Sequence, residues 1–295
     1  MIQDSRIKFV FFGTPELSVE ILEHLKENGF IPSLIVTNPD RPQGRKMILT
    51  PPPVKLWAQK NEIKFLQPEK LDSVFNLQLA TYNPQLFIVV AYGKILPKKV
   101  LEIPEKGTLN IHYSLLPKYR GASPIESAIL NDDKDTGVSI MLMDERMDHG
   151  PVVAQQRPEN HESGIMNQEW PMKASELRGV MNKIAGKLLA EVIPRWVAGE
   201  INAEAQDHTQ ATYTKKFTKA DGEINLADDD YINFLKVQAF DDTIGTHFFA
   251  SKQGKNIRVV VKDAESRNGQ LIITRVIPEG KKEISYGEFE RGLKA

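Results

Sequence analysis

Residues Ile7 to Gly29, IKFVFFGTPELSVEILEHLKENG, predict a buried strand that leads directly into an amphipathic helix. The apolar run up to Gly13 has the length and composition of a strand covered on both faces. Thr14 suits the N-cap of the helix, Pro15 suits its first position, and Gly29 ends the pattern. This strand, turn and helix form the opening unit of an α/β fold.

Short apolar runs and helical patterns continue to alternate through the first half of the chain. Further strands are predicted at 33–37, 64–67, 86–93, 107–113, 137–144 and 152–156, and helices at 51–63, 71–84 and 173–197. Apolar strands separated by helices predict a mostly parallel, Rossmann-like sheet with helices on both of its faces. Such a sheet binds ligands beyond the carboxyl ends of its strands.

The last part of the chain has a different pattern. Residues 198–210, AGEINAEAQDHTQ, are small and polar and indicate a linker, and alternating runs at 256–265 and 269–280 predict a small β-rich domain. The acidic run Asp228–Asp230 is interpreted as a solvated turn. We therefore expect a catalytic domain over 1–188, a linker over 189–207 and a second domain over 208–295.

Composition limits the classes of function. The net charge is −1, so binding to nucleic acid would depend on a local basic patch. Cysteine is absent, which excludes disulfides, zinc–thiolate sites and a cysteine nucleophile, and agrees with a cytoplasmic protein. We expect neither a signal peptide nor a membrane span, because no apolar run is long enough.

The turn after the first strand argues against a dinucleotide cofactor. That fingerprint needs three glycines, for a tight turn, for approach of the pyrophosphate and for helix packing. The stretch FFGTPELS supplies Gly13 alone. A tight turn between strand and helix explains this glycine, so a dehydrogenase is disfavoured.

Polar side chains with catalytic chemistry follow two apolar strands. Asn110 and His112, in GTLNIHY, alternate on one face of a predicted strand near its carboxyl end. Asp144, Asp148 and His149 follow the next strand, in MDERMDHG. An amide can hold a carbonyl oxygen that gains charge, a histidine can move a proton near neutral pH, and an aspartate can orient an imidazole.

These side chains at two neighbouring strand ends indicate acyl transfer without an enzyme nucleophile, in which a substrate amine attacks directly. Satisfied polar groups at strand ends remain the plain structural alternative. A metal site built on His112, Asp148 and His149 is a weaker alternative, because the spacing matches no metal motif, and we expect no metal.

The motifs together identify a family. The stretches GTLNIHYSLLPKYRGASPI, TGVSIMLMDERMDHGPVV, VVAYGKILP and GTPE resemble the folate-dependent formyltransferases. The stretches TNPDRPQGR, PPPVK, ATYTKKFTKADGEI and VIPEGKKE resemble the branch that acts on initiator tRNA. The resemblance implies a Rossmann-like catalytic domain, a linker and an OB-like C-terminal barrel. It also implies 10-formyltetrahydrofolate as donor and the amine of methionyl initiator tRNA as acceptor.

The resemblance assigns roles to individual residues. It implies that Asn110, His112 and Asp148 are catalytic, and that a turn and a strand exit contact folate, namely Ser114, Leu115, Leu116, Pro117, Tyr92 and Gly93. The cations expected to bind tRNA are Arg41, Arg45, Lys46, Lys215 and Lys216. The first three are expected near the acceptor end of the tRNA, with Arg45 as the main contact, and the two lysines of the second domain are expected at phosphates along the stem. The alternatives are a formyltransferase for an amino sugar nucleotide or glycinamide ribonucleotide, and a binding module without catalysis. We expect a monomer.

Overall fold

The computed structural model describes residues 7–44, 46–158, 170–252 and 254–294. Contacts divide the chain into two compact units: the first is Met1–Arg120, Gly137–Pro158 and Met181–Thr212, and the second is Gly121–Thr136, Glu159–Val180 and Tyr213–Ala295. Because the chain passes between them more than once, each unit combines separate segments. The domain boundaries at 188 and 208, expected from the sequence, stay a prediction.

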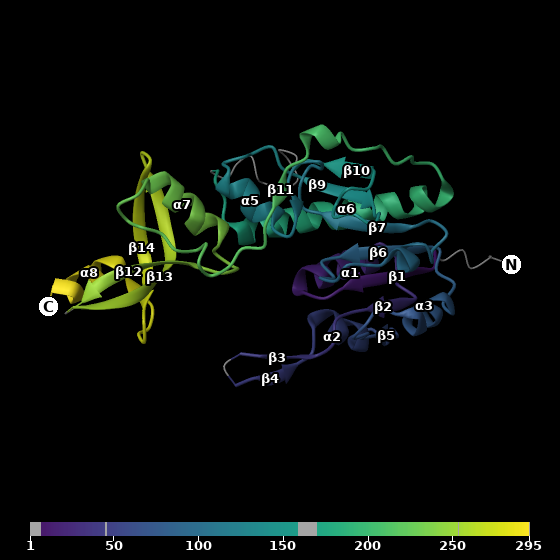
Figure 1. Cartoon of the computed structure of the whole chain (residues 1–295), viewed down its shortest axis with the longest axis horizontal. Helices are drawn as coiled ribbons and strands as arrows, with labels where there is room; N and C mark the ends of the chain where they lie inside the picture. The colour runs from purple at the N-terminus through teal and green to yellow at the C-terminus, as the bar shows by residue number, and fades with distance from the viewer. Residues whose placement is uncertain (1–6, 45, 159–169, 253, 295) are drawn as a thin grey trace. The chain divides into compact units, whose positions relative to one another are not determined.

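A seven-stranded sheet forms the centre of the first unit, in the order β10-β9-β7-β6-β1-β2-β5 (Figure 1). Strands β7, β6, β1, β2 and β5 are parallel neighbours, whereas β9 runs antiparallel to both β7 and β10. The mostly parallel sheet predicted from the sequence is confirmed. The strand bounds are β1 Phe9–Gly13, β2 Leu34–Val36, β5 Phe65–Leu66, β6 Leu86–Val90, β7 Thr108–His112, β9 Val138–Leu142 and β10 Val152–Gln156.

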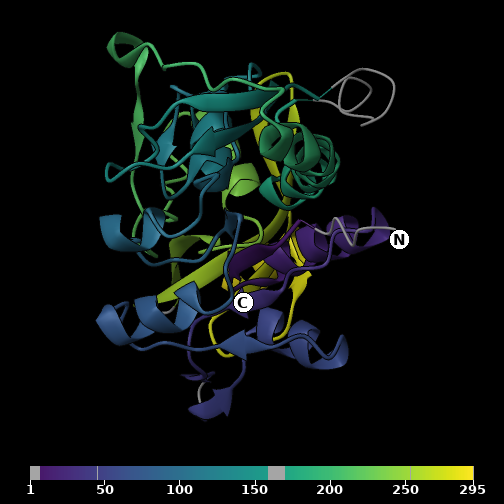
Figure 2. The ribbon, with the colours of Figure 1, turned by 90° about the vertical axis from the view of Figure 1, so that its right-hand side faces the viewer.

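Helices cover both faces of this sheet because its strands are apolar on both sides. Helices α3 (Ser73–Ala80) and α4 (Lys98–Leu101) share one buried core with Val10, Phe87 and Val89. Helix α1 (Glu16–Glu27) buries Ile21, Leu22 and Leu25, and packs with α2 (Pro53–Lys60). The 181–198 part of α6 (Ala174–Ala198) lies beside α1, seen as the green and purple helices of Figure 2.

The opening turn differs from the prediction at its cap. Pro15 is the N-cap of α1 and makes no side-chain capping bond, while the Thr14 hydroxyl donates to the Tyr92 carbonyl oxygen, 3.1 Å away. Gly13 is required for close packing, since a Cβ there would lie 2.8 Å from the Ser18 Cβ. Thr14 therefore ties the first strand exit to the β6 exit instead of capping the helix.

The second unit has an antiparallel sheet of β12 (Thr246–Lys252), β13 (Lys255–Arg267), β14 (Gln270–Pro278) and β15 (Ile284–Ser285). Its strands fit a small barrel-like domain. Their apolar face forms a core with helix α7 (Asp230–Ala239) and helix α8 (Tyr286–Lys294). In the same unit, α5 (Pro124–Leu130) packs on α7. The two long strands predicted from the sequence are confirmed.

The acidic run Asp228–Asp230 is exposed at Asp228 and Asp229, as expected of a solvated turn, but it also begins a helix that this interpretation did not include. Asp229 caps α7 by accepting from the Ile232 N–H at 2.9 Å, and Asp230 occupies the first turn. Carboxylates are favourable there because the helix dipole is positive at its N-terminus.

The remaining short elements lie outside the main layers. Strands β3 (Arg41–Gln43) and β4 (Ile48–Thr50) form a hairpin, and β8 (Arg120–Gly121) pairs with β11 (Tyr213–Thr214) in a second two-stranded sheet. A 3₁₀ turn, His208–Gln210, precedes β11 along the chain. Among the described residues, no helix combines the length and hydrophobicity needed to span a bilayer.

Candidate active site

The exits of β6 and β7 frame the candidate site. These strands are parallel neighbours in which Val89 is in register with Asn110, so both strands end at the same edge of the sheet. Asn110 is half-buried and His112 is 5% exposed, and strand alternation places them on one face. The structure thus brings together the two polar side chains that the sequence predicted as a pair.

His112 has a partner for each ring nitrogen. Its Nε2 lies 2.8 Å from the Tyr119 carbonyl oxygen, and its Nδ1 lies 3.7 Å from an Asp148 carboxylate oxygen. A carbonyl can only accept, so Nε2 carries the hydrogen. Nδ1 therefore carries no hydrogen in the neutral ring, and it faces the Asp148 carboxylate.

Asp148 reaches His112 by a route that differs from the prediction. The sequence suggested two neighbouring strand ends, but β9 is antiparallel to β7, and its last residue Leu142 pairs with Leu109 at the start of β7. The segment after β9 therefore has to turn back along the sheet to bring Asp148 beside His112. Asp148 itself adopts a left-handed backbone conformation, with φ of 48°.

The second acid and histidine of this turn form a separate pair. His149 Nδ1 lies 2.7 Å from an Asp144 carboxylate oxygen, and the His149 ring stacks on His208 with centroids 4.0 Å apart. Asp148 is therefore the carboxylate that faces His112, and Asp144 is the carboxylate that contacts His149. The sequence pattern placed both acids near a histidine without separating the two pairs.

The turn expected to contact folate is fixed by hydroxyl groups. Ser114 is fully buried and its Oγ donates to the Lys118 carbonyl oxygen at 2.6 Å. The Ser139 hydroxyl donates to the Ser114 carbonyl oxygen and accepts from the Leu116 N–H. Leu115 and Leu116 are 7% and 5% exposed, and Pro117 follows them. This turn leaves β7 at the same edge as Asn110 and His112.

The β6 exit contributes backbone groups more than side chains. The Tyr92 ring is 1% exposed and packs edge-to-face on Phe12, and burial raises the pKa of its phenol to about 12. The Tyr92 carbonyl accepts from the Asn38 side chain at 2.8 Å, and Gly93 follows with φ of 79°. Of these two predicted folate contacts, Tyr92 can therefore reach a ligand through its backbone alone.

A small open hollow adjoins this exit. It has a volume of about 330 Å³, and Thr14, Asn38, Arg41, Gly93 and Lys94 are among its lining residues. Within the described part of the chain, the buried Asn38 Oδ1 has no hydrogen-bond partner. Arg41 gives this hollow a cationic rim, while the Lys94 ammonium bonds to the carbonyl oxygens of Pro68 and Glu69.

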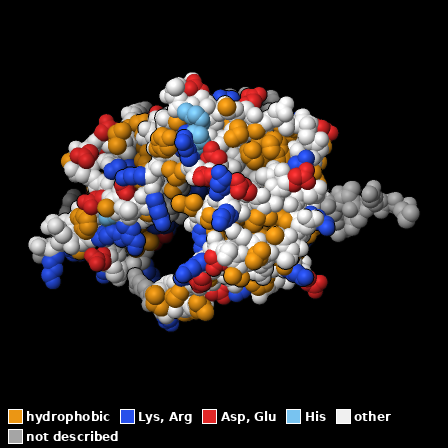
Figure 3. All heavy atoms as spheres, turned by 45° about the vertical axis from the view of Figure 1, so that its right-hand side comes forward, with side chains coloured by type: hydrophobic (Ala, Val, Ile, Leu, Met, Phe, Trp, Pro, Cys, Tyr) orange, Lys and Arg blue, Asp and Glu red, His pale blue; other side chains and the backbone are white. Residues whose placement is uncertain are grey.

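The cations expected to bind tRNA occupy exposed positions. Arg41 lies on β3, where its Nη2 is 3.1 Å from Glu69, and Lys46 lies in the turn of the hairpin. In the second unit, Lys215 pairs with Asp221, and Lys216 is exposed. Arg45 lies outside the described residues. Lys and Arg are interspersed with acids on the face drawn in Figure 3, so the cations do not form one continuous field there.

The basic run from Arg41 to Lys60 separates into different environments. Lys55, on α2, bonds to both oxygens of Asp40 at 2.9 and 2.7 Å, and this bond holds the pKa of Asp40 below its usual range. Lys60 lies at the other end of the helix, in a groove between helices. Arg41 and Lys46 are thus the described cations of this run that lie on the hairpin.

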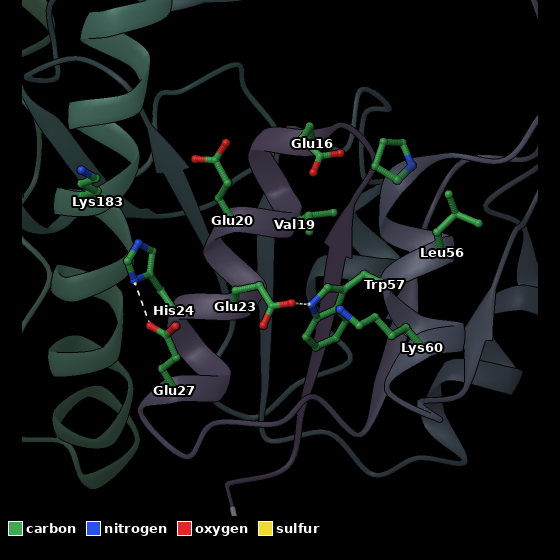
Figure 4. A pocket seen from close by; sticks show the side chains of 11 residues that line it. Glu16, Val19, Glu20, Glu23, His24, Glu27, Leu56, Trp57, Lys60 and Lys183 are labelled. Atoms are coloured by element: carbon green, nitrogen blue, oxygen red, sulfur yellow. Dashed lines mark hydrogen bonds and ion pairs between the residues drawn. The ribbon is translucent and has the colours of Figure 1, made fainter.

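That groove is larger than the hollow at the β6 exit, but its acidic lining is unfavourable for a polyanion. It has a volume of about 640 Å³, and Figure 4 shows Glu16, Glu20, Glu23 and Glu27 of α1 along it. Three of these acids have partners: Glu23 accepts from the Trp57 indole at 2.7 Å, Glu20 accepts from the side chain of Asn182, and Glu27 lies 3.7 Å from His24 Nδ1. No residue of the catalytic set lines it.

Two further residues support the site although the sequence did not single them out. Arg120 is 1% exposed, and Gln206 is 7% exposed. The Gln206 amide nitrogen contacts the carbonyl oxygens of Asp148 and Gly150, and its oxygen accepts from Arg120. The described residues include no group of three or more acids and histidines placed to hold a metal ion.

Comparison with known proteins identifies the family of the chain. The family model for the formyl transferases matches residues 5–164. A methionyl-tRNA formyltransferase of Herpetosiphon aurantiacus is 36% identical, with 98% of each chain covered. That of Chloroflexus aurantiacus is 38% identical over 92% of this chain and 84% of its own.

Solved structures show the same fold at lower identity. The methionyl-tRNA formyltransferase from Clostridium thermocellum has a TM-score of 0.60 at 16% identity, covering 95% of this chain and 99% of its own. A 4-N formyltransferase from Francisella tularensis has a TM-score of 0.63 at 17% identity, covering 86% of this chain and 97% of its own. The fold is therefore shared by formyltransferases that act on different acceptors by name, so the fold does not distinguish among them. The higher sequence identity to the methionyl-tRNA formyltransferases does. On that identity, over nearly its whole length, the chain belongs to the methionyl-tRNA formyltransferase family.

Proposed function

We propose that the protein transfers the formyl group of 10-formyltetrahydrofolate to the α-amine of methionyl initiator tRNA, a step of translation initiation. The observation that carries this proposal is the convergence of Asn110, His112 and Asp148, with His112 Nδ1 3.7 Å from Asp148. It occurs in a chain that shares 36% identity over 98% of its length with a methionyl-tRNA formyltransferase. The sequence has no cysteine to act as a nucleophile, and direct attack by the amine requires none.

Asn110 stabilises the intermediate in this proposal. The amine attacks the formyl carbon, a carbon–nitrogen bond forms, and the carbonyl oxygen becomes an oxyanion. The Asn110 amide donates a hydrogen bond to that oxyanion, and His112 Nδ1 adds a second donor once the amine proton has been transferred to the pair it forms with Asp148. Donors held in place before the reaction stabilise developing charge without a reorganisation cost.

His112 and Asp148 manage the proton. The attacking amine must lose a proton as the new bond forms, and the pair formed by His112 Nδ1 and the Asp148 carboxylate accepts it. Because Nε2 is held by the Tyr119 carbonyl at 2.8 Å, the ring stays oriented with Nδ1 toward Asp148. When the intermediate collapses, the bond to N10 breaks, and the pair returns the proton to the folate nitrogen.

In this proposal, different segments of the chain contact folate and tRNA. Ser114–Pro117 and the backbone of Tyr92 and Gly93 leave adjacent strands at one edge, which supports their role as folate contacts. Arg41, Arg45 and Lys46 would contact the acceptor end of the tRNA. Lys215 and Lys216 in the 208–295 domain would contact stem phosphates. We place the reaction in the cytoplasm, where initiator tRNA is aminoacylated, and propose that a monomer carries it out.

A competition between acceptors tests this function. The protein is incubated with 10-formyltetrahydrofolate and, separately, methionyl initiator tRNA, an amino sugar nucleotide or glycinamide ribonucleotide, and each formylated product is measured. We expect N-formylmethionyl-tRNA as the main product. Faster formylation of either small acceptor would assign the protein to the alternative, and release of formate without transfer would exclude all three.

A further inference from the structure

Asp148 lies in a turn whose backbone requires outside support. Its φ of 48° lies in the left-handed region, which is sparsely populated by residues with a Cβ, although aspartate adopts it more readily than most of them. At Gly150 a Cβ would lie 1.9 Å from the Leu142 carbonyl oxygen, so the turn folds closely onto the end of β9. A catalytic carboxylate on such a turn keeps its position only if other residues fix the backbone.

Gln206 supplies that support from a distant segment. Its Nε2 donates to the carbonyl oxygens of Asp148 at 3.0 Å and Gly150 at 2.6 Å, so one buried amide bonds to both sides of the turn. An antiparallel bridge fixes its approach, because Glu204 exchanges backbone hydrogen bonds of 2.7 and 2.8 Å with Val152. Gln206 follows this bridge and faces the turn.

Arg120 connects Gln206 to the histidine side of the site. Its Nε and Nη2 donate to Gln206 Oε1 at 3.2 and 2.6 Å. The preceding residue, Tyr119, provides the carbonyl oxygen that receives the His112 Nε2 hydrogen. The Arg120 backbone N–H bonds to the Thr212 carbonyl at 2.9 Å, which fixes this corner to the same segment as Gln206.

We propose that Gln206 is a positioning residue that sets the distance between the Asp148 carboxylate and His112 Nδ1. It holds the Asp148 turn through two donors and the Tyr119–Arg120 corner through its oxygen, so both partners of the proton-transferring pair are placed against one amide. The amide is fully engaged, which makes its orientation unambiguous. This role deepens the proposed function and rests on it.

Two substitutions separate the contacts of Gln206. Gln206→Leu keeps the approximate volume and removes all of the hydrogen bonds. Gln206→Glu keeps the shape and the acceptor for Arg120 but loses the donors to the turn. Gln210→Leu is the control, because Gln210 is exposed on the same segment and bonds to Asp207.

The expected result is a loss in kcat without a loss in binding. In both Gln206 variants kcat should fall by about 10- to 100-fold, as expected when a reacting group is displaced by roughly 1 Å, while the two KM values change less than about twofold. The control should match the wild type. Circular dichroism and thermal unfolding establish that each variant is folded.

A double variant distinguishes positioning from a general structural role. If Gln206 acts through Asp148, adding Gln206→Leu to Asp148→Asn should lower kcat no further than Asp148→Asn alone. An independent loss of the same factor in both backgrounds would overturn the proposal, as would normal kcat in a folded Gln206→Leu. If that variant does not fold, Gln206→Glu carries the same comparison. Failure of both to fold would assign Gln206 to stability and overturn the positioning role.

A structural readout separates this inference from the proposed function. The carbonyl ¹³C shifts of Asp148 and Gly150 report their hydrogen bonds without any substrate, and both should change in Gln206→Glu but not in Gln210→Leu. If the wild-type protein fails to formylate methionyl-tRNA, the proposed function falls. Unchanged carbonyl shifts in Gln206→Glu would instead show that the Gln206 amide does not hold the turn, and would overturn the positioning role.

Discussion

The corner from Gly107 to Arg120 and the hairpin of β3 and β4 are built in opposite ways. In the corner, His112, Ser114 and Arg120 are 5%, 0% and 1% exposed, and side chains fix the backbone at several points. In the hairpin, Met47, Ile48 and Leu49 are 68%, 62% and 65% exposed. The corner is preorganised before substrate arrives, whereas the hairpin presents its residues to solvent.

This difference separates chemistry from recognition of the acceptor. Buried, hydrogen-bonded groups stabilise a transition state because they need no reorganisation. Exposed cations increase affinity for a polyanion and are weakened by salt. Substitutions in the corner, or of the Asp148 carboxylate that faces His112 of the corner, should therefore lower kcat, and substitutions on the hairpin should raise KM for tRNA. The following predictions test that division, beginning with the largest expected effect.

Asp148→Asn should cause the largest loss. The substitution keeps the shape of the side chain but removes the carboxylate that lies 3.7 Å from His112 Nδ1 and that, in the proposed mechanism, shares in accepting the amine proton. A positioned acid or base contributes typically about 10²- to 10⁴-fold, so we expect a loss in kcat within that range, with folate affinity nearly unchanged. Pre-steady-state formylation and a folate titration measure the two effects. Weakened folate binding with normal turnover at saturation would show that Asp148 acts on the folate.

Asn110→Ala should cause a slightly smaller loss. It removes one donor to the oxyanion, which typically costs ~2.7–4 kcal/mol of barrier, or about 10²- to 10³-fold in kcat. The half-buried side chain lies in the middle of β7, whose other residues are buried and stay packed, so the thermal midpoint should change little. A folded variant with near-normal kcat would remove Asn110 from the mechanism.

Removing the hairpin cations should affect recognition alone. In an Arg41→Ala, Lys46→Ala double variant, KM for methionyl-tRNA should rise while kcat and folate affinity stay constant. Each lost phosphate contact should reduce the slope of log affinity against log salt by about 0.9 on duplex or about 0.7 on single strands. Lys8→Ala is the control, because Lys8 is exposed beside the amino end of β1. A loss in kcat would contradict the division between the two regions.

The buried region was the more predictable from sequence. Continuous apolar runs and strand alternation were enough to predict the mostly parallel sheet and to place Asn110 and His112 together. The direction of β9 was not predictable, because an apolar strand looks the same in parallel and antiparallel pairs. The route that brings Asp148 to His112 depends on that direction and on the turn that follows.

Individual polar residues were harder to interpret than periodic patterns. Gln206 stood in a small, polar stretch, and no spacing distinguishes a buried amide there from a solvated one. Asp229 carried a usable signal, since an acid that precedes Ile232 and an apolar periodic run is typical of a helix N-cap. Thr14 had the same kind of signal, and a tertiary bond to the Tyr92 carbonyl used its hydroxyl instead.

The smallest predicted effect concerns His208, an exposed residue tied to the buried corner. Its Nδ1 accepts from Arg120 Nη2 at 2.8 Å, so protonation at this nitrogen would break the contact. The pKa of His208 is held below its ordinary value of 6.5 by desolvation, and further by the positive charges of His149, Arg120 and Arg146, against the opposing carboxylate of Asp144. Between the folded and unfolded pKa values, the unfolded chain therefore binds more protons.

Stability should consequently fall as the pH drops below about 6.5, since the state that binds more protons is favoured at low pH. His208→Gln keeps an acceptor for Arg120 and removes the titration. Its thermal midpoint should match that of the wild type at about pH 8 and decline less steeply toward about pH 5.5. Thermal unfolding followed across this range measures the difference, which solvent screening keeps small. Parallel curves for the two proteins would show that protonation of His208 does not reach the Arg120 corner, and that the exposed and buried regions titrate independently.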